Sequence, residues 1–258
     1  MKFNRSLFIR CQSKLKNKNR KIHLMKNTNK PLLSSSNAKL EKGEAMGWMT
    51  LGLSLAPYNL SGRNLCPHAS AGCAAACLYT AGHGRFDGVK NARLERSRRF
   101  LSDRAAFIDQ LKAEIRKGMK TAKKKGMKVA VRLNVMSDLP WHNLIDMEEF
   151  SDVQFYDYTP NPARMLQWAN GELPANYHLT FSRKEDNQEA VELAVSAGVN
   201  VATVFDAVPT EYMGRQVVDG DLSDLRFLDP KNVIVGLKAK GDGKKDSSGF
   251  VIRASVPV

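Results

Sequence analysis

The sequence has no long apolar run and only four cysteines. A membrane span takes ~18 to 20 apolar residues in a row, so we expect a soluble, cytoplasmic protein without a membrane partner. The N-terminal LFI is also shorter than the apolar core of a signal peptide, which takes about 7 to 15 residues. Because nothing marks the chain as secreted, disulfides are not expected.

Acidic residues are scarce in two segments. The formal net charge is +14, and residues 1–45 contain 12 Lys/Arg against 2 Asp/Glu. Residues 85–128 contain 15 Lys/Arg and 5 Asp/Glu, whereas residues 129–258 contain 12 Lys/Arg and 19 Asp/Glu. A basic helical segment is typical of a solvated face, and nucleic acid or an acidic protein is the alternative partner for residues 85–128.

Two parts of the chain are predicted. Residues 1–33 have no sustained hydrophobic period and are expected to be a disordered basic tail that includes Cys11. A nucleic-acid arm, a targeting peptide and an extension before Met25 are alternatives for this tail. Residues 34–258 are expected to form one domain around a single core.

Strand-like and helix-like segments alternate after residue 45. The strands are expected at 48–56, 129–135, 153–159, 177–182, 199–205 and 232–240, with a short one at FVIRASV. The helices are expected at about 88–100 and 103–125 and in NLIDMEEF, NPARMLQWAN and EDNQEAVELAVSAG. A series of this kind predicts a parallel sheet with helical crossovers.

Several predicted strands are polar on one face. Val129, Val131 and Leu133 share one face of their strand, and Arg132 and Asn134 share the other. A parallel strand covered by helices on both sides would be apolar on both faces. The pattern therefore favours a partial (β/α) barrel whose interior binds a ligand.

Polar side chains also gather where the predicted strands end. Ligands bind at this carboxyl edge in barrels and in open parallel sheets. Arg132 and Lys238 are predicted to be ligand-binding cations, with Asp138 and Asp157 as the nearest candidate counter-charges. The full set of predicted cofactor- or ligand-binding residues is Arg132, Asn134, Ser137, Asp138, Asp157, Tyr158, Ser182, Lys238 and Lys240.

Three cysteines, Cys66, Cys73 and Cys77, lie just after the first predicted strand. AGCAAACL predicts a helix with Cys73 and Cys77 on one face at i and i+4. Three thiolates suit a [4Fe-4S] cluster with one open iron. Zinc held with His68 or His83 is the alternative, as are three unrelated buried cysteines.

The sequence resembles the gene product 88 family of bacteriophage proteins from about Ser34 to Val251. The resemblance rests on NLCPHASAGCAAACL with TAGHG, RLNVMSDLPW, YDYT, LTFS, NVATVF and DGDLSDLRFLDPKNVIVGLKAKG, and on NAKLEKGEAMGWMTLGLSLAP. It implies an iron-sulfur site and an architecture similar to the partial barrel of radical S-adenosylmethionine (SAM) enzymes.

Two departures bear on what the resemblance implies. The loop here is C-x₆-C-x₃-C rather than the C-x₃-C-x₂-C of radical SAM enzymes, and Pro160 stands where the family has lysine. SAM is therefore an additional cofactor that no motif supports. We expect either an iron-sulfur enzyme acting on a small polar or anionic molecule or a metal-stapled binding protein without enzymatic activity.

Overall fold

The computed structural model describes residues 30–35 and 42–253. The fold is the unit Leu32–Val258, apart from residues 36–41 and 254–258. Most of the predicted tail, with Cys11, lies outside the described residues. Leu32 and Leu33, which we predict as the end of the tail, lie in this unit. Leu32 is fully buried, and both backbone N–H groups donate to Glu114.

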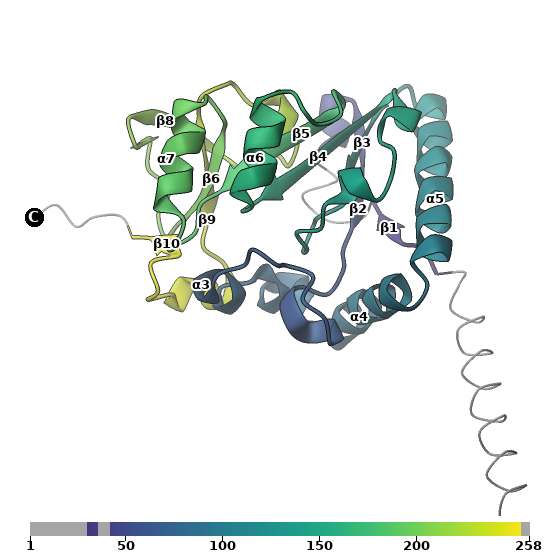
Figure 1. Ribbon diagram of the computed structural model, residues 1–258, viewed down its shortest axis with the longest axis horizontal. Helices are drawn as coiled ribbons and strands as arrows, with labels where there is room; N and C mark the ends of the chain where they lie inside the picture. Colours follow the sequence, from purple (N-terminus) through teal and green to yellow (C-terminus); the bar gives the residue numbers. More distant parts are fainter. Residues whose placement is uncertain (1–29, 36–41, 254–258) are drawn as a thin grey trace, which may run out of the picture. The chain divides into compact units, whose positions relative to one another are not determined.

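A ten-stranded sheet forms the centre of this unit (Figure 1). Among the described strands, only β1 with β2 and β7 with β8 pair antiparallel. The predicted α/β class with parallel strands is confirmed. The described sheet is open rather than closed into a barrel, because the short strands β1 and β7 form its two edges. In order across the sheet the strands are β1 (Leu33–Ser34), β2 (Trp48–Leu53), β3 (Lys128–Arg132), β4 (Val153–Thr159), β5 (Tyr177–Ser182), β6 (Val201–Phe205), β9 (Ile234–Lys238), β8 (Arg215–Asp219) and β7 (Glu211–Tyr212).

The last strand, β10 (Val251–Ile252), pairs with β6 at the carboxyl edge, beyond the end of β5. β5 pairs through its last two residues with Val201 and Ala202 of β6, and β10 pairs with Val204 and Phe205. Because β9 occupies the other side of β6, β10 extends the sheet on the side where β5 has ended.

Three helices, α5 (Arg104–Lys124), α6 (Pro162–Ala169) and α7 (Gln188–Ser196), cover one face of the sheet (Figure 1). The helix α4 (Asp87–Ser102) instead lies beyond the carboxyl ends of the strands, next to α5. α5 buries Phe107, Leu111 and Ile115 against side chains of β2 to β5, as their spacing predicts. The chain turns after α5 at Gly126, whose φ is +66°.

The opposite face of the sheet is covered by a short 3₁₀ helix, η7 (Arg226–Leu228). Ala130 and Tyr156 pack there against Leu225 and Phe227. Val129 and Val131 belong to the core on the helical face. The predicted alternation of β3 is therefore confirmed, and the face with Ala130 and Arg132 is the one that leads toward the candidate site.

NLIDMEEF does not form the predicted helix. It contains parts of two 3₁₀ turns, η5 (Trp141–Asn143) and η6 (Glu148–Phe150). The Asn176 side chain donates to the carbonyls of Met147 and Phe150, which a helix would use internally. The other short helices are η1 (Glu44–Met46), η2 (Tyr58–Ser61), α3 (Ala71–Ala75), η3 (Leu78–Thr80), η4 (Gly82–Arg85) and η8 (Gly241–Lys245).

The strands β1, β7 and β8 are not predicted, because they are short or lack an apolar face. Every described helix is too short or too polar to span a bilayer.

Candidate functional site

A cavity of about 460 Å³ lies where the carboxyl ends of the strands meet the cysteine loop. The three cysteines of that loop line it. Eight of the nine predicted ligand residues line it too; these are Arg132, Asn134, Ser137, Asp138, Tyr158, Ser182, Lys238 and Lys240. The structure thus brings together side chains from segments between residues 66 and 240.

The three cysteines come from different local structures. Cys66 lies in the loop after β2, Cys73 lies in α3, and Cys77 is the N-cap of η3. The prediction that one helix carries Cys73 and Cys77 is wrong, because α3 ends at Ala75 and Cys77 has extended backbone angles (φ −59°, ψ 134°). Cys77 instead reaches the cavity from the turn that follows the helix.

Tertiary contacts hold α3 in place. The Glu185 carboxylate accepts hydrogen bonds from the Ser70 hydroxyl and the Gly72 N–H, both at 2.7 Å. A β-carbon on Gly72 would lie 2.8 Å from that carboxylate and would also meet the Ser248 hydroxyl. Glu185 follows β5, so this contact fixes the cysteine loop to the sheet. No sequence signal pointed to Glu185.

The thiols are partly buried and close enough to influence one another's pKa. Burial raises the pKa of Cys66 to about 11 and that of Cys73 to about 12, and it also raises the pKa of Cys77. Lys184 near Cys73 and Arg93 near Cys77 act in the opposite sense. Within the described ranges, no three His, Cys, Asp or Glu side chains are grouped as a single metal ion would require.

Arg132 is paired with a carboxylate that we did not predict. Its Nη1 lies 2.9 and 3.0 Å from the two carboxyl oxygens of Asp224, which also accepts a hydrogen bond from the Tyr156 hydroxyl. The guanidinium lies over the Tyr158 ring, 4.5 Å from its centroid. The predicted counter-charges, Asp138 and Asp157, are bonded elsewhere. Asp224 is more than 90 residues away in the sequence, so spacing could not identify it.

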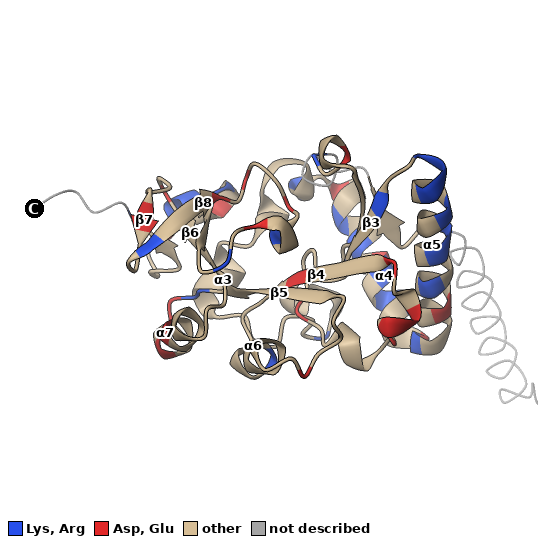
Figure 2. Cartoon of the chain, turned by 90° about the horizontal axis from the view of Figure 1, so that it is seen from above, with Lys and Arg blue, Asp and Glu red and all other residues tan. Residues whose placement is uncertain are grey.

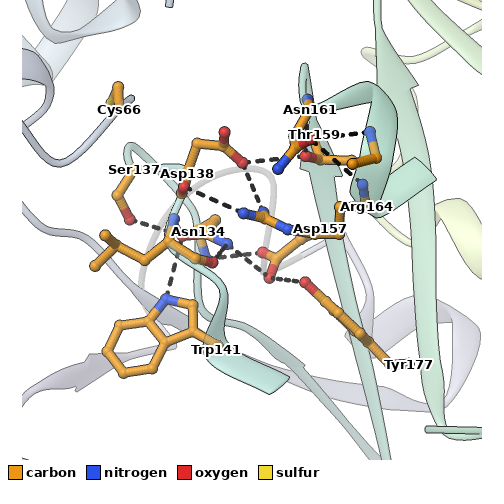
Figure 3. A network of polar contacts seen from close by, with 12 residues as sticks. Cys66, Asn134, Ser137, Asp138, Trp141, Asp157, Thr159, Asn161, Arg164 and Tyr177 are labelled. Carbon is orange, nitrogen blue, oxygen red and sulfur yellow. Dashed lines mark hydrogen bonds and ion pairs between the residues drawn. The ribbon is translucent and has the colours of Figure 1, made fainter. Parts of the chain in front are cut away.

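Asn134 and Asp157 form a network that is complete within the protein (Figure 3). The Asn134 N–H donates to Asp157 Oδ1 at 2.7 Å, and the Tyr177 hydroxyl donates to Oδ2 at 3.1 Å. Asn134 Oδ1 accepts hydrogen bonds from the Ser137 hydroxyl and Trp141 Nε1. Asp157 does not line the cavity, and burial raises its pKa to about 7. These side chains position the loop after β3.

Asp138 differs from Asp157 in how its oxygens are used. Oδ1 accepts hydrogen bonds from Arg164 Nη1 at 2.7 Å and the Thr159 hydroxyl at 3.1 Å (Figure 3). Oδ2 is buried and has no hydrogen-bond partner among the described residues. Burial raises the pKa of Asp138, whereas the Arg164 guanidinium acts to lower it.

The remaining predicted cations lie at the rim of the cavity. Lys240 pairs with Asp221 at 2.7 Å. Lys238 is exposed and forms no ion pair with a described residue; only its backbone N–H bonds to Asp221. The Tyr158 hydroxyl is buried without a partner in the described part of the chain. Lys238 and Tyr158 therefore keep polar atoms available to a ligand.

The fold and the site define an α/β protein with an open, mostly parallel sheet and a cysteine-lined cavity at its carboxyl edge. A family model described as Gene product 88 matches residues 24–254. The chain therefore belongs to the gene product 88 family, a family of phage proteins. No curated protein and no solved structure matches it.

Proposed function

We propose that this protein binds a [4Fe-4S] cluster through Cys66, Cys73 and Cys77, with the fourth iron facing the cavity. The main support is that a loop, a helix and a turn direct three cysteines to one cavity. Thiolates are the usual protein ligands of such clusters. Arg93 and Lys184 lie near two of the thiols and would partly neutralise the negative charge of the bound thiolates.

Zinc, the alternative metal, has less support. Neither His68 nor His83 lines the cavity with the cysteines. A zinc site needs four ligands around one point, and among the described side chains no such group of three or more is assembled. A cluster places its thiolates on separate irons, so its three cysteines need not converge on one point.

The cavity is suited to a small polar or anionic molecule. Its volume of about 460 Å³ lies within the ~300 to 1,000 Å³ of typical small-molecule sites. When bound, the cluster would supply a redox-active, Lewis-acidic iron. Lys238 would bind a negative group of the ligand, the Tyr158 and Ser182 hydroxyls would orient it, and apolar side chains such as Leu60 and Val204 would exclude water.

We therefore propose an iron-sulfur enzyme of the host cytoplasm with a radical-SAM-like reaction, and SAM is the additional ligand to be tested. A reducing compartment keeps thiols out of disulfides, which suits this assignment.

Anaerobic purification tests the cluster. The full-length protein is expected to be brown and to contain about four irons and four acid-labile sulfides per chain. Cys66→Ser, Cys73→Ser and Cys77→Ser should each lose this absorbance, whereas Cys11→Ser, outside the described residues, should keep it. A colourless protein with stoichiometric zinc would overturn the proposal.

A thermal-shift screen of the cluster-loaded protein tests the ligand. SAM and a panel of small organic and inorganic anions are compared, and at least one is expected to raise the melting temperature. Lys238→Met should abolish that shift. Lys231→Met, which removes an exposed cation that does not line the cavity, should keep it.

A nucleic-acid-binding scaffold is the second candidate, and exposed lysines on α5 favour it (Figure 2). Lys117, Lys120, Lys123 and Lys124 are exposed and form no ion pair with a described residue. Fluorescence anisotropy with RNA and single-stranded DNA should then show binding that weakens between 50 and 200 mM salt. Replacing the four lysines by glutamine should abolish it, and Lys231→Gln should not.

A further inference from the structure

Asp138 lies beside the first cysteine of the loop. Its backbone N–H donates to the carbonyl of Leu65 at 2.9 Å, and the Cys66 thiol donates to the carbonyl of Met136 at 3.4 Å. Two contacts therefore join the loop after β3 to the segment that carries Cys66. Asp138 and Cys66 line the same cavity.

The two carboxyl oxygens of Asp138 have different surroundings. Arg164 and Thr159 hold Oδ1, which fixes the orientation of the carboxylate. Oδ2 has no hydrogen-bond partner in the described part of the chain, although the side chain is only 5% exposed. In Figure 3 this oxygen points away from both Thr159 and Arg164. A buried carboxylate oxygen without a partner is costly, so its position calls for a partner that the described residues do not supply.

Resting on the cluster proposed above, we propose that Asp138 Oδ2 is its fourth protein ligand. The oxygen would donate a lone pair to the iron that carries no cysteine, and no electron is transferred in this step. Arg164 and Thr159 would keep Oδ1 occupied, so that only one carboxyl oxygen binds the iron.

This assignment is compatible with an iron that a ligand can reach. A single carboxylate oxygen is a harder and more readily exchanged ligand for iron than a thiolate. A small molecule entering the cavity would replace Oδ2 on the iron, and Arg164 would continue to balance the charge of the released carboxylate. The experiment must distinguish a bond between Oδ2 and iron from a direct hydrogen bond between Oδ2 and the small molecule.

The test counts iron in the anaerobically purified full-length protein before and after ferricyanide. Ferricyanide takes one electron from [4Fe-4S]²⁺, which then releases Fe²⁺ and leaves [3Fe-4S]⁺. The wild type is expected to fall from about four irons to about three and to gain the electron paramagnetic resonance signal of the three-iron cluster. Asp138→Asn should contain about three irons as purified, and Asp138→Cys should keep about four after ferricyanide.

Asp221→Asn is the matched control, because Asp221 lines the same cavity but pairs with Lys240. It should behave as the wild type does. If Asp138→Asn and Asp138→Cys both match the wild type in iron count and spectrum, this inference falls and the cluster proposal stands. If the wild type itself binds no iron, both fall. Asp138→Cys keeps the test decisive if Asp138→Asn does not fold.

Discussion

Asp157 and Asp138 lie near the carboxyl ends of neighbouring strands, and both are buried. Asp157 lies within β4, where the Asn134 backbone, the Asn134 side chain and Tyr177 use both of its oxygens. Asp138 lies in the loop after β3 and has one oxygen without a described partner. A position at a strand end therefore does not by itself make a binding residue. The number of protein donors around each carboxylate separates a structural group from one available to a ligand.

The largest effect is expected for Asp157→Leu. This change leaves the Asn134 N–H, the Asn134 side-chain amide and the Tyr177 hydroxyl buried without their acceptor. At ~1 to 3 kcal/mol for each of these three unsatisfied groups, the free energy of unfolding should fall by about 3 to 9 kcal/mol. Urea denaturation measures it, with Asp221→Asn as the control. A loss below about 1 kcal/mol would contradict the structural role.

Arg132→Met should be nearly as severe. It leaves Asp224 buried without its counter-charge, at a cost of about 3 to 5 kcal/mol. The loss of stability is expected because Arg132 is paired with Asp224. Removing a ligand-binding cation that has no ion-pair partner would be nearly neutral. The double variant Arg132→Met, Asp224→Leu should recover most of the loss. No recovery would show that the pair is not the reason for it.

Gly72→Ala should disturb the cysteine loop. The added methyl group would approach the Glu185 carboxylate and the Ser248 hydroxyl, and overpacking of this kind costs about 1 to 3 kcal/mol. Bound iron should fall along with the melting temperature. Gly88→Ala is the matched control, because a β-carbon there meets nothing within 4 Å and the residue lies in α4. Its stability should be unchanged or higher.

Asp157 should also make stability depend on pH. Its pKa is raised by burial to about 7 in the folded protein, above the ~3.9 of an unfolded chain, so the folded state holds the proton over this range. Its contribution is then fully present below pH ~4 and is lost as pH rises through about 7. Melting curves from pH 4 to 8 measure this slope. Asp157→Asn should flatten it, and an unchanged slope would assign the effect to other groups.

The smallest effect on stability is expected for Lys238→Met. Lys238 is exposed and has no described ion-pair partner, so the free energy of unfolding should change by less than about 1 kcal/mol. Its loss should be visible in ligand binding instead. A large loss of stability would show that Lys238, like Arg132, has a structural role and would contradict its availability to a ligand.

Much of the site could be located from the sequence. Polar residues after several strands and a cysteine cluster after the first predicted one meet at one cavity, because the ends of parallel strands share an edge. The partners of these residues could not be predicted. Asp224 and Glu185 are far from Arg132 and Gly72 in the sequence, and the turn that removes Cys77 from α3 depends on such contacts.

The sequence by itself determined the alternation of strands and helices, the buried face of α5 and the position of three cysteines after the first predicted strand. These features depend on residue periodicity and on short spacing along the chain. Only the tertiary structure decided that the described sheet stays open, that Arg132 is neutralised by Asp224 and that Asp157 is saturated while one oxygen of Asp138 has no described partner. The physical reason is that hydrogen-bond saturation and charge pairing depend on which distant segments pack together, and the same strand-end residue types can serve either structure or binding.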